Sequence, residues 1–134
     1  MKISDKFHSE DIYKLKNTVL TGKTEDIKWR LKNINIVSKL LDENKKEIIK
    51  SLFVDLGKSE IEGLSEILLV KEEISLIKKK LNSWMRPKKI DTPFYLFPSS
   101  SKVIYEPLGC VLILGPYNYP LLYVLKPLVN IFSA

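Results

Sequence analysis

Apolar residues recur every three or four positions along residues 5–84, which is the spacing of one face of an α-helix. The first predicted helix covers residues 5–20 and ends before Gly22, and the second begins after Thr24. Their apolar faces are Phe7, Ile12, Leu15, Val19 and Leu20 in the first helix, and Ile27, Leu31, Ile34, Val37 and Leu41 in the second. This part of the chain is therefore predicted to be a helical scaffold.

Two further helices are predicted by capping signals. Asn44 with Glu47 resembles a capping box and opens a helix that stops at Gly57. Ser59 with Glu62 is a second capping box, which opens a long helix. The apolar faces of these helices are Ile48, Ile49, Leu52, Phe53 and Leu56, and Ile67, Val70, Ile74, Ile77, Leu81 and Trp84. We expect both faces to pack on neighbouring helices rather than to form a free coiled coil.

The pattern changes after Pro87, which interrupts the helical spacing. Residues 90–106 are rich in β-branched and aromatic side chains and contain two prolines, which is typical of an edge strand or an extended arm. The unbroken apolar run "CVLIL" at 110–114 suits a parallel strand covered on both faces. Residues 121–132 then have the pattern of a helix.

These elements predict an α/β fold in three parts. Residues 1–88 form a helical segment, residues 89–106 form an extended arm, and residues 107–134 begin a layered α/β domain. The uncharged stretch 107–125 has the length of a membrane span, but Pro116, Asn118 and Pro120 lie in its middle. We therefore predict no transmembrane segment.

Composition and charge narrow the functional classes. The 134 residues carry a net charge of +6, and most lysines alternate with acidic residues, as on a solvated helix face. The exception is residues 78–89, with six cations and no acid, which could contact phosphates or acidic lipids. We favour a charged helix end, where lysine suits the helix dipole. A single cysteine and no apolar leader predict a cytoplasmic protein without internal disulfides.

The stretch "LGPYNYPLL" at 114–122 is the main candidate for chemistry. Pro116 and Pro120 fix the backbone on either side of Asn118, and Gly115 permits a sharp exit from the preceding strand. The amide of Asn118 can cap the next helix, or it can act as a neutral hydrogen-bond donor held in one place. The residues by themselves slightly favour the cap.

The same stretch belongs to a longer series of motifs. "YEPLGCVLILGPYNYPLLYVLKPLV" resembles the strand, Asn-Tyr-Pro loop and helix of the aldehyde dehydrogenase superfamily. "TGKTEDIKWRLKNINIVSKLL", "VDLGKSEIEGLSEI" and "WMRPKKIDTPFYLFPSSSKVIYEP" are similar to the class 3 or fatty-aldehyde type. The resemblance covers residues 10–134. Tyr117 replaces the commoner tryptophan and keeps an aromatic wall.

The resemblance implies NAD(P)+-dependent oxidation of an aldehyde to a carboxylic acid through a thiohemiacetal. It implies that Asn118 is the donor that stabilises the oxyanion, and that Tyr119 faces the aldehyde channel. It also implies that the nicotinamide-ribose side of the cofactor cleft is lined by Leu114, Gly115, Pro116 and Tyr117. NAD and NADP both remain open, and residues 90–106 are expected to contribute to a homodimer.

The resemblance further implies that this chain is an N-terminal portion of such an enzyme. The family's nucleophilic cysteine and general-base glutamate come later in the sequence, so we expect the isolated fragment to be inactive. Cys110 is expected to be a buried strand residue, not the nucleophile. The strand at 110–114 should then lack its sheet neighbours, and the helix at 121–132 should lack most of its partner surface.

Two other functions are considered beside the enzyme. The chain could be a non-enzymatic helical module that binds a full-length homologue, or a basic protein that touches membrane or nucleic acid through residues 78–89. We expect no nucleic-acid partner. We also expect no metal site, because His8 is the only histidine and no CxxC or HExxH motif occurs.

Overall fold

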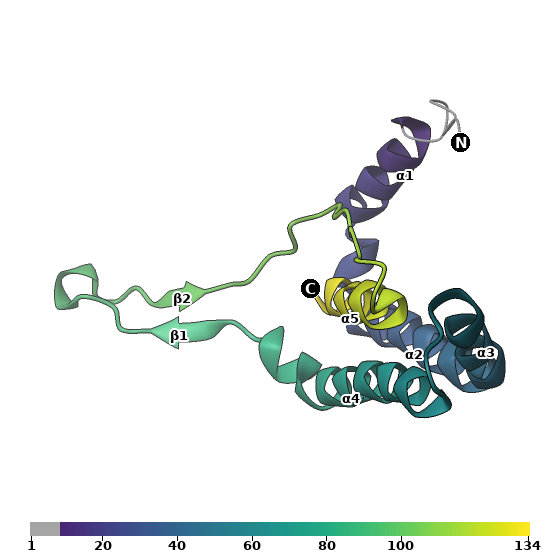
Figure 1. Cartoon of the computed structure of the whole chain (residues 1–134). Coiled ribbons are helices and arrows are strands. Elements are labelled where there is room, and N and C mark those ends of the chain that lie inside the picture. Colours follow the sequence, from purple (N-terminus) through teal and green to yellow (C-terminus); the bar gives the residue numbers. More distant parts are fainter. Residues whose placement is uncertain (1–8) are drawn as a thin grey trace.

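A β-hairpin projects from a bundle of helices in the computed structural model, which describes residues 9–134 (Figure 1). The helices are α1 (Ser9–Leu20), α2 (Ile27–Glu43), α3 (Lys45–Leu56), α4 (Glu60–Trp84) and α5 (Pro120–Ser133). The short elements are the 3-10 turns η2 (Lys23–Glu25) and η3 (Phe94–Leu96) and the strands β1 (Lys88–Ile90) and β2 (Ser101–Val103). Phe7 and His8, which entered the predictions, lie outside the described residues.

The hydrophobic core lies between α2, α4 and α5. Its buried members are Ile34, Val37 and Leu41 of α2, Ile67, Val70, Ile74, Ile77 and Leu81 of α4, and Val129 of α5. The apolar stripes predicted for the second and fourth helices therefore face the core, except for Trp84, which is 42% exposed. The expectation that the last helix lacks most of its partner surface is wrong, because α5 packs along α4 and α2 and buries Val129 completely.

Local capping signals place the turn between α3 and α4. Gly57 ends α3 with a φ of 67°, a left-handed conformation that glycine adopts readily. Ser59 Oγ accepts from the Glu62 N–H at 3.3 Å, and the Glu62 carboxylate accepts from the Ser59 N–H at 2.8 Å. The second predicted capping box is confirmed. The Ser59 hydroxyl also donates to the Glu62 carboxylate at 2.8 Å, and the bonds that this carboxylate accepts from the Ser59 backbone and then from its side chain lower the pKa of Glu62.

The first predicted capping box does not form. The Asn44 side chain makes no cap at the start of α3 and instead donates from Nδ2 to the Leu40 carbonyl at 2.9 Å. Asn44 is also the C-cap residue of α2, so its side-chain amide bonds to the end of α2 and not to the start of α3. The start of α2 is capped by Asp26, which accepts from the Lys28 N–H at 2.9 Å.

The arm predicted for residues 90–106 is the antiparallel hairpin of β1 and β2. Lys88 pairs with Val103, and Ile90 pairs with Ser101. The aromatic side chains at its tip are almost fully exposed: Phe94 by 93%, Tyr95 by 82% and Phe97 by 82%. The hairpin therefore carries apolar surface far from the helical core (Figure 1).

The strand predicted at 110–114 is absent, and the described residues contain only the two strands of the hairpin. Leu112 and Leu114 are 80% and 85% exposed. Cys110 lies at a bend and is exposed, so its expected burial is also wrong in this chain. A strand needs a neighbouring strand to bond with, and no strand among the described residues pairs with this segment.

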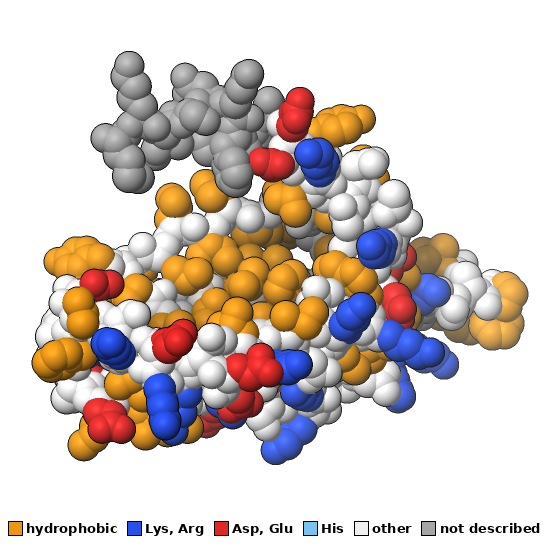
Figure 2. All heavy atoms as spheres, turned by 90° about the vertical axis from the view of Figure 1, so that its right-hand side faces the viewer, with side chains coloured by type: hydrophobic (Ala, Val, Ile, Leu, Met, Phe, Trp, Pro, Cys, Tyr) orange, Lys and Arg blue, Asp and Glu red, His pale blue; other side chains and the backbone are white. Residues whose placement is uncertain are grey.

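Much apolar surface is left uncovered by the helices. Figure 2 shows hydrophobic side chains gathered in a continuous area on the face that is turned to the right in Figure 1. Patches of this kind on a protein surface mark contacts with further protein. Across residues 9–134, no helix combines the length and the apolar character needed to cross a membrane.

Candidate functional site

Asn118 lies on the loop that leads into α5, and its side chain is exposed. The N-cap residue of α5 is Tyr119, and no side-chain cap bond forms from it. Asn118 therefore does not cap α5, and that reading of its amide is wrong. Its donor group stays open to a ligand, as an oxyanion-stabilising role requires.

The loop folds back against the first turns of α5 at Gly115. A Cβ atom at Gly115 would lie 2.6 Å from Cγ2 of Val124 and 3.7 Å from the Tyr123 carbonyl oxygen. Glycine is therefore needed here for close approach to a helix, and not for the sharp strand exit that the sequence indicated. This contact fixes one side of the loop that carries Asn118.

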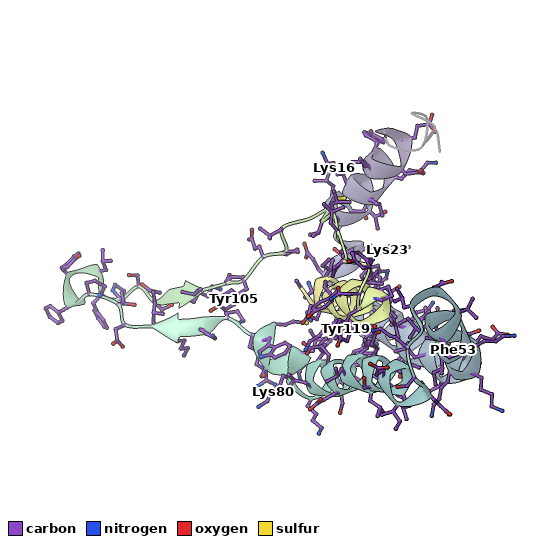
Figure 3. All side chains as sticks on the ribbon, viewed as in Figure 1. Lys16, Lys23, Phe53, Lys80, Tyr105 and Tyr119 are labelled. Atoms are coloured by element: carbon purple, nitrogen blue, oxygen red, sulfur yellow. The ribbon has the colours of Figure 1, made fainter. Side chains whose placement is uncertain are left out.

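Tyr119 fixes the other side of the loop. The ammonium group of Lys58 lies 3.8 Å from the centre of its ring, and Tyr123 meets the ring edge-on at a centroid distance of 5.9 Å. In Figure 3, Tyr119 lies where α5 begins, beside α4. One face of the ring is thus occupied by Lys58, and the role of Tyr119 in an aldehyde channel stays a prediction.

A buried carboxylate on α4 meets the start of α5, and the sequence interpretation did not include it. Glu66 is fully buried; its Oε2 accepts from the Leu122 N–H at 3.0 Å and its Oε1 is paired with Lys58. The signal was present in the sequence, because Glu66 follows Gly63 by three positions and precedes Val70 by four, on the buried face of α4. An acidic residue on such a face needs a specific partner.

A buried guanidinium group meets the other end of α5. Arg30 of α2 donates from Nε to the Thr24 carbonyl at 2.8 Å and from Nη1 to the Ser133 carbonyl at 2.9 Å. Burial lowers the pKa of Arg30, and the nearby carboxylate of Glu25 opposes this effect. Arg30 lies on the buried face of α2 and was also missed from the sequence.

Most of the chain matches a known protein family. The model of the "Aldehyde dehydrogenase family" matches residues 21–133. The chain belongs to the aldehyde dehydrogenase family. The resemblance seen in the sequence is confirmed, and the relatives include class 3 enzymes. One is aldehyde dehydrogenase family 3 member B3 of Mus musculus, 36% identical over 126 residues, which are 93% of this chain and 26% of the relative.

Staphylococcus aureus supplies one relative that is similar in sequence and one solved structure that is similar in fold. The 4,4'-diaponeurosporen-aldehyde dehydrogenase of Staphylococcus aureus is 37% identical over 115 residues, which are 85% of this chain and 25% of the relative. A solved structure described as the substrate-bound state of Staphylococcus aureus AldH matches with a TM-score of 0.88 and 34% identity, covering 92% of this chain and 27% of that one. The chain thus spans about a quarter of its relatives and has part of the aldehyde dehydrogenase fold.

The residues expected to form the cofactor wall lie together in this aldehyde dehydrogenase chain. Leu114 and Tyr117 are 85% and 84% exposed, and with Pro116 and Gly115 they lead directly to Asn118. Their apolar surface is open, and their role as one wall of a cofactor site stays a prediction. The loop 114–119 contains no cation that could bind a pyrophosphate. No metal-binding group of three His, Cys, Asp or Glu residues occurs within residues 9–134.

Proposed function

We propose that this chain supplies the oxyanion-stabilising loop of an NAD(P)+-dependent aldehyde dehydrogenase that converts an aldehyde to a carboxylic acid. The observation that carries the proposal is the exposed amide of Asn118. It is not used as a helix cap, and it lies on a loop fixed on both sides. Membership of the aldehyde dehydrogenase family supports the reaction class.

Asn118 acts on the oxygen of the aldehyde. When a thiolate attacks the carbonyl carbon, negative charge develops on that oxygen, and the amide N–H of Asn118 donates a hydrogen bond to it. A neutral amide keeps its protons at every working pH, so the donor does not titrate. One preorganised donor of this kind stabilises the transition state by about 3–4 kcal/mol.

The neighbouring residues bind the other reactants. Leu114, Gly115, Pro116 and Tyr117 form the wall against the nicotinamide-ribose part of NAD or NADP, and Tyr119 borders the aldehyde. When bound, the cofactor accepts the hydride.

The nucleophilic cysteine and the general-base glutamate are proposed to lie outside these 134 residues. Cys110 is the only cysteine of the chain, and we assign it no nucleophilic role because it precedes the loop in the sequence. The isolated 134 residues should therefore not turn over. A free exposed thiol is compatible with the reducing cytoplasm proposed for this protein.

The hairpin arm is proposed to contact a second copy of the complete protein. Its tip exposes Phe94, Tyr95 and Phe97 next to one another in sequence. Aromatic side chains are enriched in the centres of protein interfaces, and three of them exposed together favour a docking surface. A homodimer would cover this surface in both copies.

The test uses a chimera of residues 1–134 with the remaining part of the Staphylococcus aureus relative. Asn118→Ala should lower kcat by about 10²–10³-fold, with little change in the KM of the cofactor, because only the transition state loses a donor. Tyr13→Phe on the exposed surface of α1 is the control and should keep kcat. A normal kcat in Asn118→Ala would contradict the oxyanion role.

A further inference from the structure

We propose that the buried pair of Glu66 and Lys58 is a positioning device that holds Asn118 where the oxyanion forms. The inference rests on the proposed function for its catalytic consequence. Its structural basis is independent of that function. The pair contacts Tyr119, just before Pro120, and Leu122, two positions after Pro120.

Helix α5 cannot cap its own first turn. Pro120 at its first position has no N–H, and the Tyr119 side chain makes no cap bond. Glu66 takes the place of the missing cap by accepting from the Leu122 N–H, 56 positions along the chain. A carboxylate at this place also faces the positive end of the helix dipole. The direction in which the chain enters α5 therefore depends on α4.

Lys58 extends the same contact to the loop itself. Its ammonium group is paired with Glu66 Oε1 and lies over the ring of Tyr119, the residue that follows Asn118. The side chain of Lys58 is 12% exposed and that of Glu66 is not exposed at all, so water screens this pair little. Removing either charge leaves the other buried without its partner.

The position of Lys58 is fixed by the turn between α3 and α4. Gly57 before it is in the left-handed conformation, Ser59 after it belongs to a capping box, and its own N–H bonds to the Leu52 carbonyl at 3.4 Å. Lys58 thus rests on a short turn with a defined shape. From this turn, contacts lead through Glu66 to Leu122 and directly from Lys58 to Tyr119, the neighbour of Asn118.

The chain contains a second charge pair for comparison. Glu73 of α4 and Lys126 of α5 have 3.2 Å between their charged atoms, and their side chains are more exposed, by 16% and 46%. This second pair lies along α5 and away from its first turn. If Glu66 and Lys58 merely hold two helices together, loss of either pair should affect the loop in a similar way. If they position the loop, only the loss of Glu66 or Lys58 should affect it.

The catalytic test compares Glu66→Gln, Lys58→Met and Glu73→Gln in the chimera. Glu66→Gln keeps an acceptor for Leu122 but removes the charge that pairs with Lys58. Both changes at the first pair should lower kcat about tenfold or more, because a small displacement of a reacting group costs rate, while the KM of the cofactor stays within about twofold. Glu73→Gln should keep kcat within about twofold. Lys58→Arg retains the cation and should recover most of the rate.

The second test needs no activity and uses the 134-residue chain. Hydrogen exchange of the backbone amides at 121–123 should be about tenfold faster in Glu66→Gln and in Lys58→Met than in the unchanged chain. Amides of α2 should be unchanged, which shows that the variants fold, and Glu73→Gln should match the unchanged chain. Equal exchange in all variants overturns the positioning role. An inactive unchanged chimera would count against the proposed function alone, and the exchange result would still decide this inference.

Discussion

Arg30 of α2 donates a hydrogen bond to the carbonyl oxygen of Ser133 at 2.9 Å, across 103 positions of the chain. Glu66 accepts from Leu122 at the opposite end of the same helix. A carboxylate at the start of α5 and a guanidinium group at its end both match the sign of the helix dipole. Two buried charges of opposite sign therefore fix α5 at both ends.

Arg30→Met should destabilise the fold by about 2 kcal/mol, because two partly buried carbonyl groups, of Thr24 and Ser133, lose a charged donor. The free energy of unfolding in urea, followed by the helical circular-dichroism signal, measures this. Arg86→Met, at an exposed arginine, is the control and should change the free energy little. Equal effects of the two changes would show that Arg30 contributes no more to the free energy of unfolding than an exposed arginine does.

Gly115→Ala should destabilise the loop by about 1–3 kcal/mol, because its new Cβ would collide with Cγ2 of Val124. Val124→Ala removes that atom, so the double variant should recover most of the loss. A double-mutant cycle on the free energy of unfolding should give a coupling of about 1 kcal/mol. Purely additive effects would mean that Gly115 is needed for another reason.

The Glu62 capping box predicts a specific acid sensitivity. Hydrogen bonds from Ser59 lower the pKa of Glu62 below its ordinary value of 4.5, so the folded state binds the proton less readily than the unfolded state does. The stabilisation is complete above the ordinary pKa and is lost as the pH falls through the lowered one. Thermal midpoints measured across this range should fall less in Glu62→Gln, which can still accept the bond. In Glu60→Gln, a change in the same helical turn, the thermal midpoint should fall with decreasing pH as steeply as in the unchanged chain.

The hairpin tip should control association of the chimera. Replacement of Phe94 and Phe97 by Ser should shift it from dimer to monomer in light scattering coupled to size exclusion, because the exposed aromatic surface is lost. The helical circular-dichroism signal should not change, since the tip lies away from the core. Phe53→Ser is a control at an exposed phenylalanine on α3 and should leave the dimer intact. A dimer that persists after the double change would place the interface elsewhere.

The sequence by itself determined the features whose causes are local. Gly57 and the Ser59–Glu62 box set the turn between α3 and α4 because their effects act within one helical turn. The helical spacing likewise predicted which faces of α2 and α4 are buried. The family motif indicated Asn118 as a candidate site residue, but the residues that contact its loop could be seen only in the folded structure.

The tertiary structure decided whatever depends on a distant partner. Asn118 does not cap α5, because the polar contact at that helix end comes from Glu66 on another helix. Residues 110–114 have the composition of a buried strand, but they stay exposed because no neighbouring strand is present among the described residues. Hydrophobic and polar patterns act through near neighbours, whereas hydrogen bonds to a buried charge and pairing within a sheet require segments that only folding brings together.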